Sequence, residues 1–253
     1  MHEHSSLLLH KQTLPFLNIS LYLNDIKPIQ ALSIENPSEN NSNQLDIKIT
    51  GDLPFIEPFG FSIPFVPSKS QVQIPLDKLK VNRELLNKLS ETERTNITIE
   101  VSENNTAFIK ESIPINVHPL EHFGGFQNLP ELIAAYITPN HPYIYHIKRK
   151  AVGILEKQGL KTAFEGYQSN DPERVLQSMS AIYSAIQSED IVYSSLPPGY
   201  EETGQRLRLL NTIQAEKFGN CIDISLLFAA CLEAVDLNPI LIIVRGHAFV
   251  GCW

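Results

Sequence analysis

The chain has 253 residues, 43% of them hydrophobic and 19% charged, with 28 Asp and Glu against 20 Lys and Arg. This composition excludes an extensively disordered chain, and the formal net charge of −8 argues against direct nucleic-acid binding, which needs a basic surface. Three cysteines, an odd number, do not form the disulfide framework of a secreted protein, so we expect a reducing compartment and a cytoplasmic protein.

Residues 1–12 are predicted to be a flexible polar leader. Their longest apolar run covers residues 7–9, whereas a signal peptide needs about 7–15 consecutive apolar residues and a membrane helix needs about 20. The apolar runs at 226–232 and 240–244 are also too short for a membrane span. We therefore expect no targeting segment and no membrane partner.

Residues 13–118 are predicted to be β structure. Short runs rich in Ile, Val and Phe alternate with polar residues, and turn-forming clusters such as residues 35–43 separate them. Several short strands with turn signals about every ten residues are typical of an immunoglobulin-like β-sandwich. The expected strands are residues 16–23, 44–49, 61–66, 71–74, 96–101 and 107–113, with one helical insertion at 81–89.

Residues 119–253 change to a helical period, which makes the whole chain α+β. Pro130 opens a first helix that ends at Tyr136, and residues 141–158 form a second with one apolar face. Asp171 followed by Pro172 is a strong start signal for a third helix, because Asp caps the first turn and Pro fits its first position.

Residues 194–253 are predicted to combine a loop, one helix and two strands. Residues 194–199 are predicted to be the loop. Residues 221–235 form a helix that is apolar over most of its surface and is therefore expected to be buried. The β-branched run 239–244 indicates an interior strand, and residues 247–253 indicate another strand after a turn at Gly246.

A cysteine and a histidine stand where a nucleophile and a base are expected. Cys221 begins the buried helix, where unpaired N–H groups and the helix dipole favour the nucleophilic thiolate. Gly219 leaves room for a substrate backbone. His247 begins the last strand, and a strand that returns beside the helix start would bring its imidazole to the thiol as general base and then general acid.

Two other interpretations of these residues stay open. A cysteine on a buried helix is usually a small hydrophobic residue, which suits Cys231 and Cys252 and is also possible for Cys221. Cys221, His247 and Cys252 could instead be three zinc ligands, although no Cys-x-x-Cys or His-x-x-His spacing supports such a site. We predict no metal and no cofactor, and the sequence contains no glycine-rich phosphate loop.

Gln205 is the third candidate catalytic residue. Its side-chain amide could donate to a tetrahedral oxyanion together with the backbone N–H of Cys221, or it could cap or brace a loop. Asp223, in the first turn of the helix, is expected to complement the helix dipole and to accept a backbone hydrogen bond. Other polar residues are expected to be structural, with Arg206 and Arg208 paired to Glu201 or Glu202, His141 bonded within a loop, and His118, His122 and His146 in no ligand set.

Two strings in this region resemble the transglutaminase-like, or papain-like, cysteine protease superfamily. They are Phe-Gly-Asn-Cys-Ile-Asp at 218–223 and Gly-His-Ala-Phe at 246–249. A longer series of matches is similar to the amino-terminal region of large bacterial proteins that join such a domain to a superfamily-one helicase and often a nuclease. These matches lie at residues 123–125, 129–132, 139–142, 166–168 and 204–206.

The resemblance implies that Cys221 is the nucleophile and His247 the base. The superfamily's third member is an acid on the strand after the histidine, which orients the imidazole. The chain stops at Trp253, before that strand, so the resemblance also implies a truncated protein with an incomplete core. It further implies an amino-terminal β-sandwich and helicase-type domains in a longer version.

Two functions are expected from these observations. The first is a cysteine peptidase-like or acyl-transfer domain that acts on peptide or isopeptide amides of a protein substrate through Cys221, His247 and Gln205. The second is a catalytically inactive interaction or regulatory module of a nucleic-acid-processing or defence protein, which the missing acid and the acidic charge favour.

Overall fold

The computed structural model describes residues 7–127, 129–195 and 204–253. It is a mixed α+β structure with several sheets, and the chain forms two compact units, Met1–His122 and Phe123–Trp253. The boundary predicted after residue 118 stays a prediction, and residues 119–122 are grouped with the first unit, where His118 and His122 stack with ring centroids 3.9 Å apart and the Asn18 amide donates to the His122 carbonyl. Of the helices in the described ranges, none has the length and apolar character needed to cross a bilayer.

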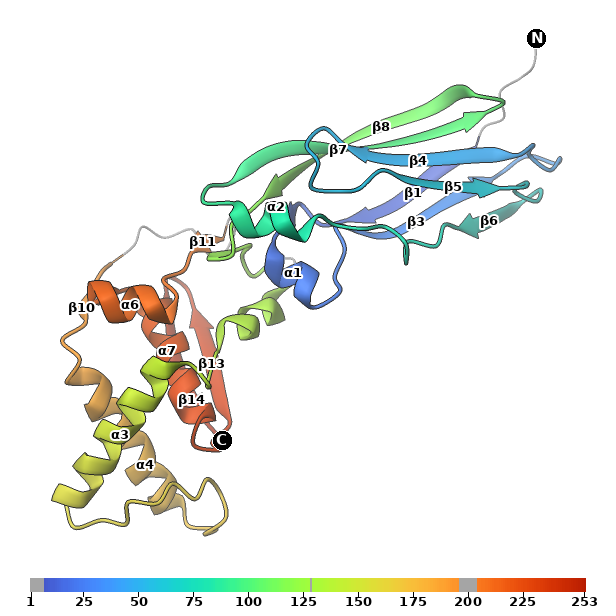
Figure 1. Ribbon diagram of the computed structural model, residues 1–253. Helices are drawn as coiled ribbons and strands as arrows, with labels where there is room; N and C mark the ends of the chain where they lie inside the picture. Colours follow the sequence, from blue (N-terminus) through green and yellow to red (C-terminus); the bar gives the residue numbers. More distant parts are fainter. Residues whose placement is uncertain (1–6, 128, 196–203) are drawn as a thin grey trace. The chain divides into compact units, whose positions relative to one another are not determined.

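The first unit contains two sheets (Figure 1). One has three strands in the order β1-β3-β6, and the other has five in the order β2-β8-β7-β4-β5. The three-stranded sheet consists of β1 (Leu8–Thr13), β3 (Ile29–Asn36) and β6 (Ser70–Gln73). The five-stranded sheet consists of β2 (Phe16–Leu17), β8 (Thr106–Val117), β7 (Glu93–Glu103), β4 (Leu45–Gly51) and β5 (Phe59–Ile63), and two short helices, α1 (Ile19–Leu23) and α2 (Arg83–Lys88), complete the unit.

Both sheets of the first unit contribute to one hydrophobic core. Alternate residues of β7 point inward, because side chains along a strand face opposite sides in turn, and Ile97, Ile99 and Val101 are buried. Leu32 and Ile34 of β3 belong to the same core. The strands predicted from alternation at 44–49, 61–66, 71–74, 96–101 and 107–113 are therefore confirmed, with ends shifted by a few residues.

Three predictions for this unit are wrong. The leader does not extend to residue 12, since β1 pairs with β3 from Leu8 onward; its side chains are mostly exposed, so backbone pairing rather than hydrophobic alternation forms it. The predicted strand 16–23 ends at Leu17, because Asn18 caps α1 by accepting from the Leu21 N–H at 2.9 Å. The strand β3 was not predicted at all.

The predicted helices of the second unit are confirmed with small shifts at their ends, and a further short helix accompanies them. These are a 3₁₀ helix η1 (Pro130–Tyr136), α3 (Pro142–Lys157), α4 (Pro172–Gln187), α6 (Leu210–Glu216), which was not predicted, and α7 (Cys221–Glu233). His141 and Asp171 cap α3 and α4 with their side chains. These helices are local in origin, because cap, proline and apolar period all lie within a few residues of each start.

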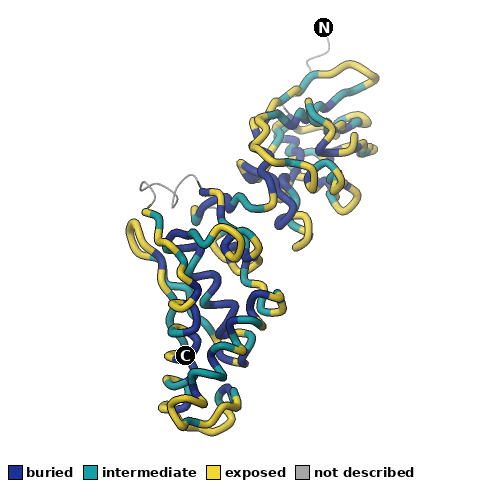
Figure 2. Tube along the Cα trace, turned by 60° about the vertical axis from the view of Figure 1, so that its left-hand side comes forward, coloured by how far each residue is buried: buried dark blue, intermediate teal, exposed yellow. Residues whose placement is uncertain are grey.

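Helix α7 passes through the centre of the second core. Ile222, Leu227, Ala230 and Leu232 are fully buried, as predicted from its apolar surface. Figure 2 shows long buried stretches in this unit between exposed loops. Short strands accompany the helices, namely β9 (His122–Phe123), β10 (Val192–Tyr193), β11 (Gln205–Arg206) and β12 (Phe218–Gly219).

Strands β13 (Pro239–Val244) and β14 (His247–Cys252) form an antiparallel hairpin beside α7 (Figure 1). Within the described residues β13 pairs only with β14, and it is half-buried, so its prediction as an interior strand is wrong. The run is apolar because the hairpin packs one face on the helix, where Ala248 is buried, while Phe249 on the other face is exposed. Of the predicted loop 194–199, residues 196–199 lie outside the described residues.

Candidate functional site

The N-terminus of α7 is held by a capping box. The Asn220 side-chain oxygen accepts from the N–H groups of Ile222 (3.0 Å) and Asp223 (3.1 Å). The Asp223 carboxylate in turn accepts from the Asn220 N–H at 3.0 Å. This reciprocal arrangement fixes the entry of the chain into the helix, and Cys221 occupies the first helical position.

Cys221 is partly exposed and its backbone N–H is not used by the fold. The thiol is half-buried. The cap takes the next two N–H groups and the Asn220 carbonyl accepts from Ile224. The Cys221 N–H has no acceptor within the described ranges of the chain. A free N–H beside a sulfur is one half of an oxyanion site.

Asp223 and Arg208 form an ion pair under this end of the helix. Asp223 is completely buried, accepts from the Arg208 N–H at 2.9 Å and meets its guanidinium at 3.1 Å. Burial raises the pKa of Asp223, although the hydrogen bonds from Arg208 and Asn220 oppose that change. The predicted backbone hydrogen bond of Asp223 is confirmed, whereas Glu201 and Glu202, predicted as partners of Arg206 and Arg208, lie outside the described residues.

The chain topology brings His247 to the same end of α7 as Cys221. The helix is about 18 Å long at 1.5 Å per residue, and β13 returns along it over about 17 Å at 3.3 Å per residue. Pro239 follows the helix by a short turn in which the Leu237 N–H donates to the Leu232 carbonyl. The turn at Gly246 (φ 75°) and the start of β14 therefore lie level with the start of the helix.

The two side chains are not hydrogen-bonded to each other. His247 is exposed and its ring lies beside that of Phe249, with centroids 6.4 Å apart. No hydrogen bond joins it to the Cys221 thiol in the described part of the structure. The hairpin alternation places His247 on the face opposite buried Ala248. The topology agrees with the prediction that Cys221 and His247 lie at the same end of α7. Within the described residues, however, their side chains are not hydrogen-bonded to each other.

Gln205 is buried with its amide unsatisfied. Only 9% of the residue is exposed, and neither Nε2 nor Oε1 has a hydrogen-bond partner within the described chain. It lies three residues before Arg208, so its Cα is within about 11 Å of that residue, which is bonded to the start of α7. Gly204 precedes it at φ 77°, and a Cβ there would be 2.1 Å from the Phe123 carbonyl oxygen, so only glycine fits this approach. The alternative role of bracing a loop through hydrogen bonds is not observed.

Tyr193 is the site residue that sequence reasoning missed. Strands β10 and β12 pair in parallel with Tyr193 opposite Gly219, and the Ser194 N–H donates to the Gly219 carbonyl at 2.8 Å. This pairing brings the Tyr193 phenol beside the Cys221 thiol. Desolvation of the phenol, followed by its contact with Cys221, raises the pKa of Tyr193, so the phenol keeps its proton. Two-residue strands have no period that a sequence could reveal.

The other two cysteines lie away from this site. Cys231 is buried in the last turn of α7, and burial raises the pKa of its thiol to about 12, which fits the predicted hydrophobic role. Cys252 lies at the far end of β14, where its sulfur is 3.2 Å from the Tyr167 hydroxyl. Within the described ranges no three His, Cys, Asp or Glu side chains are grouped as metal ligands, so Cys221, His247 and Cys252 do not form the alternative zinc site.

The remaining polar clusters are structural. His141 accepts from the Tyr143 N–H and contacts Asn211 at 2.8 Å, as expected for a loop histidine. The buried Glu189 carboxylate contacts Lys150 (2.5 Å) and Lys217 (2.6 Å). The Tyr143 hydroxyl and His146 also bond it, at 3.1 and 3.0 Å. Burial opposes its ionisation, but these donors lower the pKa of Glu189 to about 2. The cluster joins α3 and α4 to Lys217, the residue before β12.

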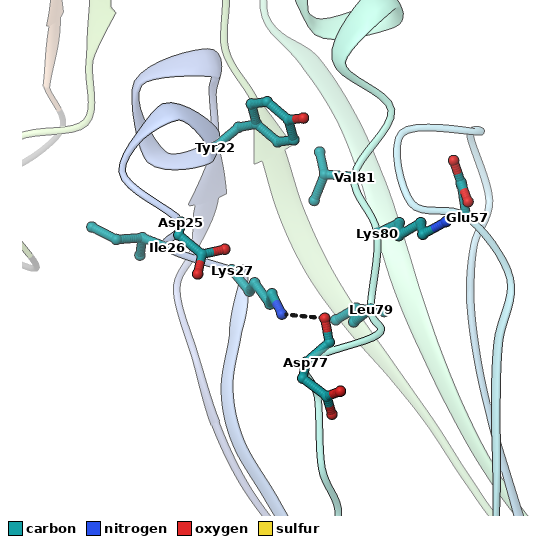
Figure 3. Close-up of a pocket in the computed structure, with 9 residues that line it drawn as sticks. All are labelled: Tyr22, Asp25, Ile26, Lys27, Glu57, Asp77, Leu79, Lys80 and Val81. Carbon is teal, nitrogen blue, oxygen red and sulfur yellow. Dashed lines mark hydrogen bonds between the residues drawn. The ribbon is translucent and has the colours of Figure 1, made fainter.

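The first unit has a separate pocket of about 370 Å³, shown in Figure 3. The Lys27 ammonium in it donates to the carbonyls of Leu76 and Asp77 at 2.7 and 3.0 Å, so its charge is already used by the fold. Asp25 and Glu57 also line the pocket, from opposite sides in Figure 3. None of the candidate catalytic residues lines this pocket.

The comparisons with known proteins give no relative, since no protein-family model and no curated protein matches the chain.

Proposed function

We propose that the second unit is a cysteine acyl-transfer or peptidase-like domain in which Cys221 attacks an amide of a protein or peptide. The observation that carries the proposal is the half-buried Cys221 thiol on the first turn of a buried helix, next to a backbone N–H that has no acceptor among the described residues. Structural cysteines are usually sealed in apolar surroundings, as Cys231 is. A nucleophilic cysteine needs partial exposure and an electropositive neighbourhood, and the start of a helix supplies it.

In the proposed reaction the thiol proton passes to the His247 imidazole and Sγ forms a bond to the carbonyl carbon. The carbonyl electron pair moves to oxygen, and the Cys221 N–H receives that charge. When the carbonyl re-forms, the carbon–nitrogen bond breaks and the imidazolium returns the proton to the leaving nitrogen. Water or an acceptor amine then attacks the thioester, which transfers the acyl group to the attacking molecule and returns the Cys221 thiol. Because His247 lies on the hairpin face opposite the one that packs on α7, this sequence requires the turn at Gly246 to rearrange so that the imidazole reaches the sulfur.

The unsatisfied amide of Gln205 supports the same proposal. A buried polar side chain without a partner costs about 1–3 kcal/mol, so such a group needs an explanation. A developing oxyanion on a substrate would be a partner for Nε2. Gln205 is therefore proposed as an oxyanion donor that comes into use when the site opens to a substrate.

The finer fold assignment belongs to this proposal. The transglutaminase-like core is proposed from the two strings around Cys221 and His247, and the helix–hairpin arrangement of α7, β13 and β14 is compatible with it. The immunoglobulin-like sandwich is proposed for the first unit from its two sheets around one core. Helicase-type domains as partners in a longer protein, a role in nucleic-acid processing and a cytoplasmic location remain proposals of the same kind.

Alkylation and acylation of the full chain test the nucleophile. We expect iodoacetamide to label Cys221 at least tenfold faster than Cys231 and Cys252, because only Cys221 is both accessible and at a helix N-terminus. Peptide mass spectrometry after partial labelling gives the rates. Cys221→Ala should abolish acyl transfer from p-nitrophenyl acetate, whereas Cys231→Ala, the matched control on the same helix, should leave it in place. Equal labelling of all three cysteines would contradict the proposal.

A non-catalytic interaction module is the second candidate function. Val244 and Phe249 lie on one face of the hairpin with His247 and are 46% and 43% exposed, which leaves an apolar surface. The missing hydrogen bond between Cys221 and His247 favours the same function. A His247→Ala variant separates the two candidates: acyl transfer falls by about 10²-fold or more if the imidazole is the base and is unchanged if it is not.

A further inference from the structure

We infer that Tyr193 is a further catalytic residue of the Cys221 site, and that its hydroxyl donates to the oxyanion formed at the attacked carbonyl. This inference rests on the proposed function of Cys221. It assigns to the reaction a side chain from β10, an element that no sequence motif marks.

The position of Tyr193 is fixed by the backbone. The parallel pairing of β10 with β12 sets Tyr193 opposite Gly219, two residues before Cys221. Hydrogen bonds on both sides of Tyr193 hold this register, from the Val192 N–H to the Lys217 carbonyl and from the Ser194 N–H to the Gly219 carbonyl, each at 2.8 Å. The strand that carries the phenol is therefore tied to the strand that leads into the nucleophile.

The Glu189 cluster strengthens this tie. Lys217, whose carbonyl accepts from Val192, is bonded through its ammonium to the Glu189 carboxylate at 2.6 Å. Glu189 is itself only four residues before Tyr193 and is anchored to α3 by Lys150. The buried carboxylate thus joins the segments that lead into β10 and β12, at the end of the strand pair where both strands begin.

The contact made by Tyr193 is suited to an oxyanion. The strand pairing brings its hydroxyl beside the Cys221 thiol, which contributes to the raised pKa of Tyr193, and a carbonyl bonded to that sulfur would carry its oxygen toward the same donor. The phenol is 53% exposed, so a substrate reaches it without rearrangement of the core. Gln205, by contrast, is 9% exposed. The Cys221 N–H and the Tyr193 O–H then form a pair of donors on accessible sides of the thiol.

A comparison of two reactions of Cys221 tests this role. Alkylation by iodoacetamide displaces iodide from a saturated carbon and forms no oxyanion, whereas acylation by p-nitrophenyl acetate passes through one. Tyr193→Phe keeps the ring and removes only the donor. We expect the acylation rate constant of the full chain to fall about 10²–10³-fold, the usual effect of one oxyanion donor, and the alkylation rate to change less than about threefold.

The control is Tyr145→Phe, since Tyr145 is similarly exposed (57%) but lies on α3 away from the thiol; it should leave both rates unchanged. Circular dichroism and the melting temperature confirm that each variant is folded. Equal falls of acylation and alkylation in Tyr193→Phe would overturn the inference, because Tyr193 would then act on the sulfur itself. Unchanged acylation in Tyr193→Phe, with an active parent protein, would overturn it while leaving Cys221 as nucleophile. A parent protein that is not acylated at Cys221 would overturn both proposals.

Discussion

Ionic side chains are placed differently in the two units. In the described part of the first unit, the buried polar residues are Asn18, Ser20, Ser33, Asn36 and His118, and none of them is an acid, a lysine or an arginine. In the second unit Arg174, Glu189 and Asp223 are buried. Two sheets satisfy their backbone groups in ladders and leave charges at the surface. The helical unit uses buried charges to hold segments together, with Arg174 bonded to the loop before α4 and Glu189 and Asp223 bonded to segments around the start of α7.

This contrast indicates how strongly each unit should be destabilised when one of its charged side chains is replaced. Taking a charge out of water is costly, and removing one partner of a buried pair leaves the other charge uncompensated. Surface ion pairs such as Lys69 with Glu39, both mostly exposed, contribute little. The second unit should therefore lose more stability from single charge substitutions than the first, and the predictions below test that difference.

The largest expected effect is that of Asp223→Ala. It leaves the Arg208 guanidinium and the Asn220 N–H without their acceptor and opens the capping box, so we expect a loss of about 3–5 kcal/mol. Urea unfolding followed by helical circular dichroism measures it, since the long helices all belong to the second unit. The matched control is Asp46→Ala in the first unit, which loses one exposed contact to Ser62 and should cost less than about 1 kcal/mol. Similar losses for the two variants would remove the contrast between the units.

The next effect is an acid-induced loss of stability in the second unit through Glu189. Its pKa is about 2 in the fold against an ordinary value of 4.5. The unfolded state therefore binds the proton first, and the stabilisation is complete above pH 4.5 and is lost as the pH falls toward 2. The difference corresponds to about 3 kcal/mol. Glu189→Gln should flatten the pH dependence of urea unfolding in this window, whereas Glu216→Gln, an exposed residue of α6, should not; a profile unchanged by Glu189→Gln would contradict the assignment.

The last effect, no larger than that of Glu189, is expected in the first unit, at His118. Burial, and then the neighbouring His122, lower the pKa of His118 from 6.5 to about 4. The unfolded chain therefore gains a proton in this range before the folded chain does, and the stability of the first unit falls as the pH drops from 6.5 to 4, by about 3 kcal/mol. His118→Phe should flatten that slope, as measured by urea titration of the Ile99 and Ile115 methyl resonances. The exposed His10 provides the control as His10→Gln. A slope that persists in His118→Phe would show that another group is responsible.

Much of the fold followed from local sequence signals. Helices α3, α4 and α7 begin where His141, Asp171 and Asn220 cap them, and cap and apolar period lie within one or two turns. The alternating strands β4, β7 and β8 were also predictable, because each repeats its pattern over several residues. Strand β1 was not, since its residues are mostly exposed and only the backbone pairing with β3 makes it a strand.

The features of the candidate site also fall into two groups, those set by neighbouring residues and those set by contacts between distant parts of the chain. Local signals were enough to predict that Cys221 begins a buried helix and that His247 begins a strand after a tight turn, because these features depend on neighbouring residues. The long-range packing had to be known to see that Tyr193 lies beside the thiol, that Glu189 is bonded to Lys217 before β12, and that the Gln205 amide is buried without a partner among the described residues. Those contacts join residues far apart along the chain through strand pairing and charge burial, and such pairings are set by the packing of the whole unit rather than by any local pattern.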